Sequence, residues 1–459
     1  MSVTLVIAQD LAVELLAAAQ GPVETAGVLL ARLVVTPSGN QRLLARTVHW
    51  IPENAYQRRT SRELLVASTG YVPALAAAEA DSCVPIWLHT HPGNGASPRP
   101  GARDARVDRE LADVFRLRAA SAWYGAIVLA QDGSRLAFDG HIESEHERVA
   151  IDRLWIVGRR LALIRNHRQV PPGHDAVFDR NIRAFGGGVQ QVLGDLRVAV
   201  VGCGGTGSAV IEQLARLGVR EFSLFDPDML ADTNTTRVYG SSPADVGRAK
   251  VDVAADHVRR IAPDAQVTAF GAKVTSLDTA LQLLDVDLVF GCTDDNAGRL
   301  VLSRLATYCL TPVLDSGVLL TSDDAGGLTS IDARVTLVAP HCACLVCRGR
   351  IDMARAAAEM LTSEEHRRLE AEGYAPGLPG VEPAVAYTTH VAAAAVGELL
   401  ERLVGFGPEP APTEVLLRLH EREISTNDAS PRYRHYCHPD SGKIGLGRTE
   451  PFLEQTWHE

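Results

Sequence analysis

Two histidines and two acidic residues in the first third of the chain have the types and spacing of a hydrolytic metal site. His89 and His91 stand two residues apart after an apolar segment, so on an extended backbone both rings project from one face and can share one ion. Asp104 opens the next predicted helix and can supply a third ligand. Three protein ligands leave a fourth position for water, whose proton a further carboxylate must accept. Glu24, just before a predicted strand, is the candidate for that base.

The order of these residues resembles that of the JAMM (MPN, Mov34) metallo-isopeptidase family. The resemblance rests on Glu-Thr-Ala-Gly at 24–27, the His-x-His-Pro motif and the later aspartate. It implies that the glutamate is the general base and that the two histidines and the aspartate bind a catalytic Zn²⁺. In that family a serine donates to the developing oxyanion. Here Gly101 stands at the expected position, the interval before Asp104 is longer than usual, and Ser97 is the nearest substitute.

A second group of residues begins with a glycine-rich turn between a β-branched run and an apolar helical pattern. The motif Gly-x-Gly-Gly-x-Gly at 202–207 lets the backbone approach a phosphate at a helix N-terminus. Asp226 ends the next predicted strand, where a ribose-binding acid belongs. These features alone fit a dehydrogenase equally well. A polar series follows, and it favours transfer of AMP to a carboxylate, which needs cations against a triphosphate: Asp228, Asn234, Arg237 and Lys250.

This part of the chain resembles the ThiF-type adenylating family, which includes ubiquitin-activating enzymes and activators of sulfur carriers. The matching features are the lead-in from Arg180 to Gln190, the glycine motif, the polar series and Thr293-Asp294. The resemblance implies that Asp294 binds Mg²⁺ and that Arg180 reaches into the ATP site of a partner in a homodimer. It assigns catalytic roles to Arg237, Lys250 and Asp294. The further residues it assigns to ATP are Gly202, Gly204, Gly205, Gly207, Asp226, Asp228 and Asn234.

The cysteine pattern predicts a second metal site, of structural type. The chain has eight cysteines, and Cys344 and Cys347 match the zinc-binding Cys-x-x-Cys of the ThiF-type family. The family's second pair is incomplete, because the segment His-Tyr-Cys-His at 435–438 offers only Cys437. Either Cys342 or a neighbouring histidine can complete four ligands. Such a zinc would tie the tail to the domain.

The same pattern limits how an activated acyl group can leave. Ubiquitin-activating relatives carry a nucleophilic cysteine in the segment before the final helix, but no cysteine lies between Arg348 and Tyr436. A thioester on that segment is therefore excluded. The acyl-adenylate must pass to a thiol of another protein or to a sulfur source, unless Thr362 or Ser363 accepts it as an ester.

The elements that must position these residues belong to an α/β protein of two domains. The chain has 459 residues, of which 46% are hydrophobic and 22% charged, and its formal net charge is −11. This composition is typical of soluble globular proteins and gives no support to nucleic-acid binding. We expect a JAMM-type α/β metalloprotease domain at 1–145, a helical linker at 146–177 and a Rossmann-like ThiF-type adenylation domain at 178–459. No apolar stretch is long enough to span a membrane, and acidic residues interrupt the start of the chain, so we expect a cytoplasmic protein.

The two resemblances together predict an enzyme that processes and activates a ubiquitin-like protein. Zn²⁺-dependent cleavage would trim its C-terminal tail or reverse a conjugate, and Mg²⁺-ATP would then adenylate the terminal glycine for transfer to a conjugating enzyme. One alternative is activation of a sulfur carrier for cofactor biosynthesis, with a sulfur donor as the acceptor. The others are a catalytically silent binding scaffold and a dehydrogenase, which the basic residues of the polar series disfavour.

Overall fold

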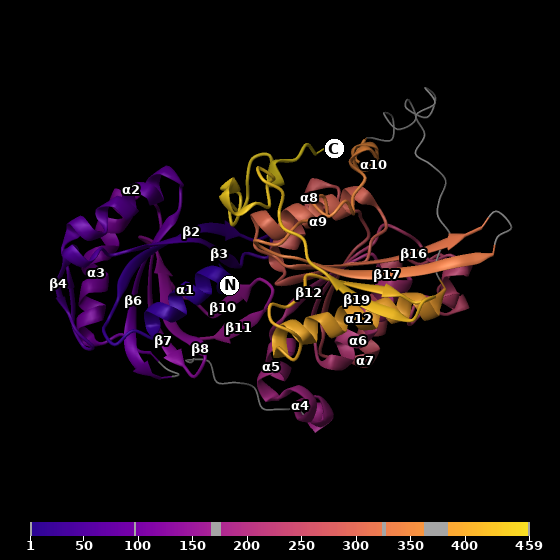
Figure 1. Ribbon diagram of the computed structural model, residues 1–459, viewed down its shortest axis with the longest axis horizontal. Coiled ribbons are helices and arrows are strands. Elements are labelled where there is room, and N and C mark those ends of the chain that lie inside the picture. Colours follow the sequence, from indigo (N-terminus) through magenta and orange to yellow (C-terminus); the bar gives the residue numbers. More distant parts are fainter. Residues whose placement is uncertain (1, 96–97, 167–175, 324–326, 362–383, 458–459) are drawn as a thin grey trace. The chain divides into compact units, whose positions relative to one another are not determined.

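The chain folds into two compact units, which are described separately. The computed structural model describes residues 2–95, 98–166, 176–323, 327–361 and 384–457. One unit comprises Met1–Pro171 with Ile444–Arg448, and the other comprises Pro172–Lys443 with Thr449–Glu459 (Figure 1). Among the described helices, none is long and apolar enough to cross a membrane.

The first unit is built on a mixed nine-stranded sheet with the order β11-β10-β1-β3-β2-β6-β7-β8-β9. At its centre β2 pairs antiparallel with β6, and β6 pairs parallel with β7. The strands are β1 (Val3–Ala8), β2 (Ala26–Val35), β3 (Gln41–Trp50), β6 (Val84–Asn94), β7 (Tyr124–Asp132), β8 (Arg135–Glu143), β9 (Arg148–Ala150), β10 (Arg153–Val157) and β11 (Ala162–Arg165). The helices are α1 (Gln9–Ala19), α2 (Val72–Ala80) and α3 (Ala102–Arg118), and β4 (Tyr56–Arg59) and β5 (Leu64–Val66) form a separate hairpin.

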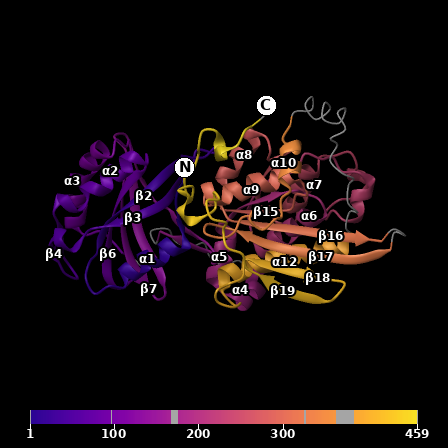
Figure 2. The same cartoon turned by 45° about the horizontal axis from the view of Figure 1, so that its top comes forward.

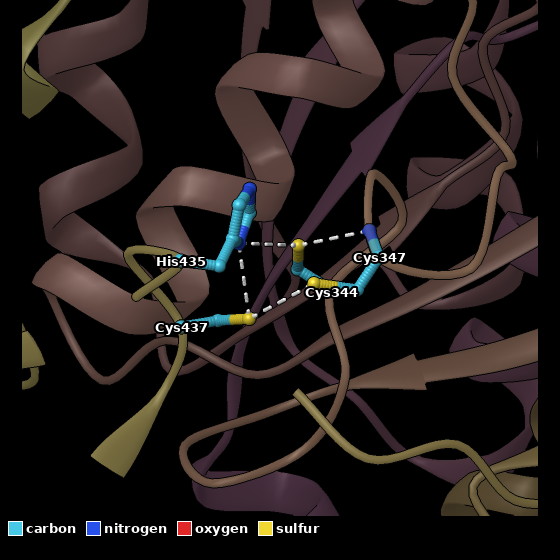
Figure 3. A group of neighbouring side chains, drawn as sticks. All are labelled: Cys344, Cys347, His435 and Cys437. Carbon is cyan, nitrogen blue, oxygen red and sulfur yellow. Dashed lines mark hydrogen bonds between the residues drawn. The ribbon is translucent and has the colours of Figure 1, made fainter. Parts of the chain in front are cut away.

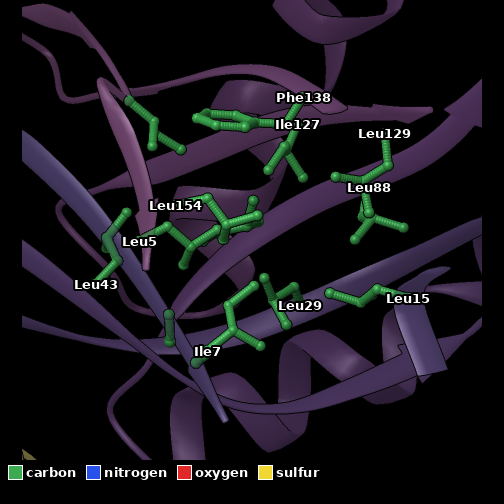
Figure 4. Packing of buried hydrophobic residues seen from close by; sticks show 14 of the residues in the cluster. Leu5, Ile7, Leu15, Leu29, Leu43, Leu88, Ile127, Leu129, Phe138 and Leu154 are labelled. Atoms are coloured by element: carbon green, nitrogen blue, oxygen red, sulfur yellow. The ribbon is translucent and has the colours of Figure 1, made fainter. Parts of the chain in front are cut away.

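The central strands are hydrophobic on both faces, and each face has its own core. Leu29 of β2 and Leu15 of α1 belong to one cluster, which also holds buried side chains of β1, β6, β7 and β8 (Figure 4). The neighbouring residue Val28 belongs to the other cluster, with Leu75 of α2 and Phe115 of α3. Because side chains alternate along a strand, α1 covers one face of the sheet and α2 and α3 cover the other.

The expected helical linker at 146–177 is wrong for the described residues up to 166. These form β9, β10 and β11 at the two edges of the first sheet. Leu154 and Trp155 are adjacent and both fully buried, because β10 pairs in parallel with β1 and is covered on both faces. A short apolar run of this kind has no alternation, so periodicity cannot distinguish it from a buried helix.

The second unit is built on an eight-stranded sheet with the order β14-β13-β12-β15-β16-β17-β18-β19. The strands from β14 to β16 are parallel, and those from β16 to β19 are antiparallel and lie side by side in both views (Figures 1 and 2). The strands are β12 (Arg197–Val201), β13 (Glu221–Phe225), β14 (Gln266–Phe270), β15 (Leu288–Gly291), β16 (Val313–Ser322), β17 (Leu328–Val338), β18 (Glu414–Arg418) and β19 (Glu423–Asn427). The α-helices are α4 (Asp179–Phe185), α5 (Gly187–Asp195), α6 (Gly205–Leu217), α7 (Lys250–Ile261), α8 (Leu277–Gln282), α9 (Asn296–Tyr308), α10 (Met353–Glu359) and α12 (Val385–Val404).

The parallel part of this sheet is Rossmann-like. Its first strand, β12, lies between β13 on one side and β15 on the other. The strand order therefore reverses between β12 and β15, and ligands of such sheets bind beyond the carboxyl ends of the strands at that point. The turn after β12 leads directly into α6, whose N-terminus is placed at the same edge.

Candidate functional sites

One strand and one helix of the first unit bring the three expected metal ligands together. β6 carries His89 and His91, and the start of α3 carries Asp104. The Nε2 atom of His89 lies 3.8 Å from Oδ1 of Asp104, and the Nε2 atom of His91 lies 3.6 Å from Oδ2. One ligand atom from each residue lies within 4.8 Å of the others. The three side chains can therefore surround a single small cation.

Asp104 is held in its position by the helix that carries it. The backbone N–H of Gly101 donates to Oδ2 of Asp104 at 2.7 Å, so the Asp104 side chain folds back over the start of α3. Burial opposes ionisation of this carboxyl, but its interactions with His89 and His91 lower the pKa of Asp104 overall. Gly101, at the expected serine position, therefore contributes only its backbone. The substitute donor Ser97 lies outside the described residues.

The expected base faces the same space as these ligands. Glu24 lines a cavity of about 730 Å³ together with His89, His91 and Asp104. Its backbone N–H donates to the carbonyl of Thr60 at 2.8 Å, which fixes the residue at the entrance to β2. Burial raises the pKa of the Glu24 carboxyl, and the two histidines oppose the shift. A carboxyl with a raised pKa next to a metal-ligating group is suited to accept and return a proton.

The donor set fits a zinc ion. His89 is 6% exposed, and neither of its ring nitrogens has a hydrogen-bond partner among the described residues. Buried polar atoms without partners are rare in native proteins, and a cation would satisfy one of these nitrogens. Two imidazoles and one carboxylate, with a water in the fourth position, form a common catalytic zinc set.

In the second unit, the glycine turn has a backbone that only glycine accommodates. Gly202 has φ +92°, and a Cβ there would lie 2.6 Å from the carbonyl oxygen of Cys292. A Cβ on Gly207 would lie 1.8 Å from the carbonyl oxygen of Gly202. The tight turn places the N-terminus of α6 at a cavity of about 340 Å³, which Gly204 and Gly205 line. A helix N-terminus behind an open backbone turn is a phosphate-binding arrangement.

Asp226 ties the end of β13 to the glycine turn. Its Oδ2 accepts the backbone N–H of Cys203 at 2.7 Å, and its Oδ1 accepts that of Asp228 at 2.9 Å. Burial raises the pKa of Asp226, and the backbone donors and Lys250 oppose the shift. Lys250 Nζ in turn lies 2.8 Å from Oδ2 of Asp228. A cation and a carboxylate thus face the cavity as an ion pair that a phosphate can compete for.

The structure brings most, but not all, of the expected ATP-binding residues to this cavity. Asn234 and Gly207 do not line it. The side-chain oxygen of Asn234 instead accepts a hydrogen bond from the backbone N–H of Ala231 at 3.1 Å, which shapes the loop after β13. Arg180 lies exposed on α4 and does not reach the cavity within its own chain. The expected residues that line it are Gly202, Gly204, Gly205, Asp226, Asp228, Arg237, Lys250 and Asp294.

Lys273 and Ser316 are among the lining residues that have no role in the sequence-based prediction. Lys273 follows the carboxyl end of β14, as Asp226 follows that of β13. Because β13 and β14 are parallel, the strand pattern could have predicted that Lys273 lies near the cavity. Ser316 lies in β16, and its Oγ is buried and has no hydrogen-bond partner among the described residues. No sequence signal distinguishes it from other strand serines.

The cysteine cluster assembles from two distant segments. Cys344, Cys347, His435 and Cys437 point toward one another (Figure 3), and their ligand atoms lie within 4.8 Å. The Nδ1 atom of His435 lies 3.5 Å from Sγ of Cys344 and 3.3 Å from Sγ of Cys437. The neighbouring Cys437 thiol lowers the pKa of Cys344 to about 5, although burial opposes the shift. Cys342, the other candidate for a fourth ligand, is not a member of this group.

Comparisons with known proteins agree with the geometry of the second unit. The model of the ThiF family matches residues 178–438. Ubiquitin-like modifier-activating enzyme 5 of Bombyx mori is 30% identical over 188 residues, which cover 38% of this chain and 44% of that protein. Molybdopterin-synthase adenylyltransferase of Escherichia coli (strain K12) is 37% identical over 118 residues, which cover 26% of this chain and 47% of that protein.

The chain spans about half the length of these curated relatives. Among solved structures, E. coli MccB with ATP is similar at a TM-score of 0.44 and 18% identity, over 58% of this chain and 76% of that one. The family match alone covers more than half of the 459 residues. The chain therefore belongs to the ThiF family.

Proposed function

We propose that the second unit adenylates the C-terminal glycine carboxylate of a ubiquitin-like protein. The observation that carries this proposal is the meeting of the glycine turn, Asp226, Arg237, Lys250 and Asp294 around one cavity. Membership of the ThiF family and the similarity to a ubiquitin-like modifier-activating enzyme support it. In the reaction, a carboxylate oxygen attacks the α-phosphorus of ATP. The bond from that phosphorus to the bridging oxygen breaks, and pyrophosphate leaves.

The residues around the cavity divide this work. The backbone of the glycine turn and the N-terminus of α6 would hold phosphate oxygens, and Asp226 would accept hydroxyl hydrogens of the ribose. Lys250 would leave its ion pair with Asp228 and bind a phosphate oxygen instead, and Arg237 would add a second positive charge next to the phosphates. Asp294 would hold Mg²⁺, which supplies charge neutralisation on the leaving pyrophosphate.

We infer that the first unit is a JAMM-type hydrolase that acts on the same ubiquitin-like protein, either on its C-terminal tail or on its conjugates. The single support for this half is geometric: Glu24 lies in the cavity that the metal-ligating residues His89, His91 and Asp104 line. A zinc ion held there would lower the pKa of a bound water. Glu24 would accept the water proton and return it to the leaving amine.

The proposed division of the chain follows from these two halves. Residues 1–145 carry the hydrolase site and residues 178–459 carry the adenylation site, with strands β9 to β11 added to the first unit. Arg180 would complete the ATP site of a second copy, which makes a homodimer the proposed assembly. The Cys344, Cys347, His435 and Cys437 group fits a structural zinc, because its thiolate and imidazole donors are those of a closed tetrahedral site.

Sulfur-carrier activation is the second candidate. The absence of any cysteine between Arg348 and Tyr436 favours it, because the acyl group cannot move to a thiol in that segment. The similarity to a molybdopterin-synthase adenylyltransferase points the same way. Thr362 and Ser363, the candidate ester acceptors, lie outside the described residues. Formation of a thiocarboxylate with a persulfide donor, rather than transfer to a conjugating enzyme, would identify this route.

The test is ATP–pyrophosphate exchange with a panel of ubiquitin-like proteins ending in glycine, each as a trimmed form and as a C-terminally extended precursor. We expect exchange with a trimmed form in the absence or presence of a zinc chelator. Exchange with the precursor should require zinc, because the tail must first be removed. A lack of exchange with every trimmed form would contradict the adenylation proposal. Exchange with precursors in the presence of the chelator would contradict the order of trimming and activation.

A further inference from the structure

The loop that carries Asp294 is short and is held by hydrogen bonds on both sides. It follows β15, and α9 begins two residues after Asp294. On one side, the hydroxyl of Thr293 donates to the carboxylate of Asp295. On the other side, the same carboxylate accepts the backbone N–H of Gly298 and caps α9. The orientation of Asp294, the residue proposed to hold Mg²⁺, therefore depends on how the first turn of α9 is held.

A residue from a distant part of the sequence also holds this turn. Glu359 is the last residue of α10, which packs against α9 (Figures 1 and 2). One carboxylate oxygen of Glu359 accepts the backbone N–H of Ala297 at 2.8 Å, and the other accepts the side-chain N–H of Asn296 at 3.3 Å. Ala297 is fully buried, so water cannot replace this acceptor at the helix start.

Asn296 connects the same turn to the opposite end of α10. Its Oδ1 accepts the backbone N–H of Asp352 at 2.9 Å, and Asp352 is the N-cap residue of α10. The Asn296 side chain thus forms hydrogen bonds with both ends of α10, and the carboxylate of Glu359 joins Asn296 to the backbone of α9. α10 therefore cannot shift along α9 without breaking one of these bonds.

Glu359 lies outside the nucleotide cavity. Asp294, Asp295 and Arg299 line that cavity, whereas neither Glu359 nor Asn296 is among its described lining residues. Among the residues that the structure describes, no group of side chains able to share a metal ion includes Glu359. Its contacts therefore reach Asp294 through the backbone of α9. Removal of such an indirect partner of a metal-binding side chain typically lowers metal affinity by about 10- to 100-fold.

We propose that Glu359 is a positioning residue for adenylation: it fixes the first turn of α9 and thereby holds Asp294 in the orientation that binds the Mg²⁺ of ATP. This inference rests on the proposed adenylation and identifies a residue outside the cavity on which that reaction depends. The carboxylate of Glu359 takes no part in bond formation or cleavage. The residue lies 63 positions after Asn296 and belongs to none of the motifs of the nucleotide site, so only the tertiary structure identifies it.

The test measures ATP binding by calorimetry, once with excess Mg²⁺ and once with EDTA, and compares the ratio of the two dissociation constants. We expect Mg²⁺ to tighten ATP binding to the wild type, and Asp294→Ala to lose this effect. Glu359→Ala should reduce the ratio about fivefold, while its affinity for ATP in EDTA stays close to that of the wild type. Glu359→Gln keeps an oxygen that can accept the N–H of Ala297, so it should retain most of the ratio.

Asp287→Ala is the matched control. Asp287 is buried just before β15, and its carboxylate accepts the backbone N–H of Arg197 at 3.1 Å. The substitution removes the same kind of hydrogen bond at the amino end of the strand that leads to Asp294, and it should leave the ratio unchanged. Amide hydrogen exchange gives a second readout that needs no nucleotide. Exchange at 293–299, relative to that of β12, should be faster in Glu359→Ala and unchanged in Asp287→Ala.

These measurements separate the positioning role from the proposed adenylation. A ratio in Glu359→Ala equal to that of the wild type, or equal exchange at 293–299 in the two proteins, would overturn the positioning role. If instead the ATP affinity of the wild type does not depend on Mg²⁺ but exchange at 293–299 is faster in Glu359→Ala, the adenylation proposal is contradicted, whereas the role of Glu359 in fixing this turn is supported.

Discussion

Substitution of Glu24 distinguishes whether this buried carboxylate, beside the proposed metal ligands, acts as a base or as a ligand. It lines the same cavity as His89, His91 and Asp104, but the group of side chains that can share one ion does not include it. Glu24→Gln keeps the size of the side chain and removes its ability to accept a proton. We expect zinc content equal to the wild type and a cleavage rate lower by about 10²- to 10⁴-fold. Loss of zinc, measured by elemental analysis, would instead identify Glu24 as a ligand.

The ionisation of Glu414 determines how acid affects the stability of the second unit. It is fully buried on β18, and its carboxylate accepts hydrogen bonds from Arg350 at 3.0 Å and from Asn427 at 2.9 Å. Burial disfavours the charge, but the bonds from Arg350 and Asn427 hold the pKa of Glu414 at about 2, against an ordinary 4.5. A lowered folded-state pKa contributes stability above the ordinary value, and this contribution is lost as the pH falls from about 4.5 toward 2.

Glu414 also pairs with the buried guanidinium of Arg348, at 3.4 Å. Glu414→Gln should therefore destabilise the second unit by about 3 to 5 kcal/mol at neutral pH, because it leaves the buried Arg348 and the partly buried Arg350 without their charge partner. The difference in unfolding free energy from the wild type should shrink as the pH falls below 4.5. Denaturant unfolding at a series of pH values measures it. A difference that stays constant down to the lowest pH at which both proteins fold would show that the charge of Glu414 is not the cause.

For individual residues, the sequence predicts a ligand cluster well when its members are close in the chain, and less well when one member comes from a distant segment. The His-x-His motif and the aspartate after it are close in the chain, and one strand and the following helix bring them together. The fourth member of the cysteine cluster depends on a fold-level event instead, because residues 435–437 return to Cys344 from far along the chain. Spacing therefore left both Cys342 and a histidine as candidates, and only tertiary structure separates them.

At the scale of elements, the glycine turn between β12 and α6 makes the sharpest prediction. In Gly207→Ala, a Cβ atom with ideal geometry would lie only 1.8 Å from the carbonyl oxygen of Gly202 and would overlap it. Backbone must move to relieve the overlap, so we expect a loss of about 1 to 3 kcal/mol of stability or more. ATP binding should fall with it, because the same turn lines the cavity. Calorimetric melting and nucleotide titration measure both effects.

Gly188→Ala in α5 is the matched control, because an added Cβ there meets nothing within 4 Å. We expect this change to leave ATP binding unchanged and stability equal or slightly higher. An equal loss of stability from both substitutions would mean that loss of glycine itself, rather than the close approach at the turn, is responsible.

Elements differ in how well the sequence predicts them. The glycine motif marks both the end of β12 and the start of α6, so that strand and helix are predictable from local residues. β10 has no such markers. Its strand form depends on pairing with β1, which is adjacent in the sheet but about 150 residues earlier in the sequence. The error at 146–177 thus has a physical origin: non-local pairing determines the structure of a segment whose own pattern is ambiguous.

For the whole molecule, the central question is whether the two proposed activities are independent. The proposed metal ligands lie in the first unit and the proposed nucleotide cavity in the second, and none of the described residues lines both cavities. Asp294→Ala should abolish pyrophosphate exchange, because no carboxylate would hold Mg²⁺ at that position, while tail cleavage stays within about twofold of the wild type. His91→Ala should do the reverse, since two protein ligands rarely retain a catalytic zinc.

A mixture of the two variants distinguishes independence from coupling. If each site acts alone and the trimmed protein is released between the steps, Asp294→Ala will trim a precursor that His91→Ala then adenylates. The mixture should recover pyrophosphate exchange with the extended form, after a lag that shortens as the concentration of the trimming variant rises. If instead the tail passes from one site to the other without release, the mixture will remain inactive on the precursor although each variant retains its own reaction. The lag is the discriminating quantity, because only a freely diffusing intermediate makes it depend on the concentration of the first enzyme.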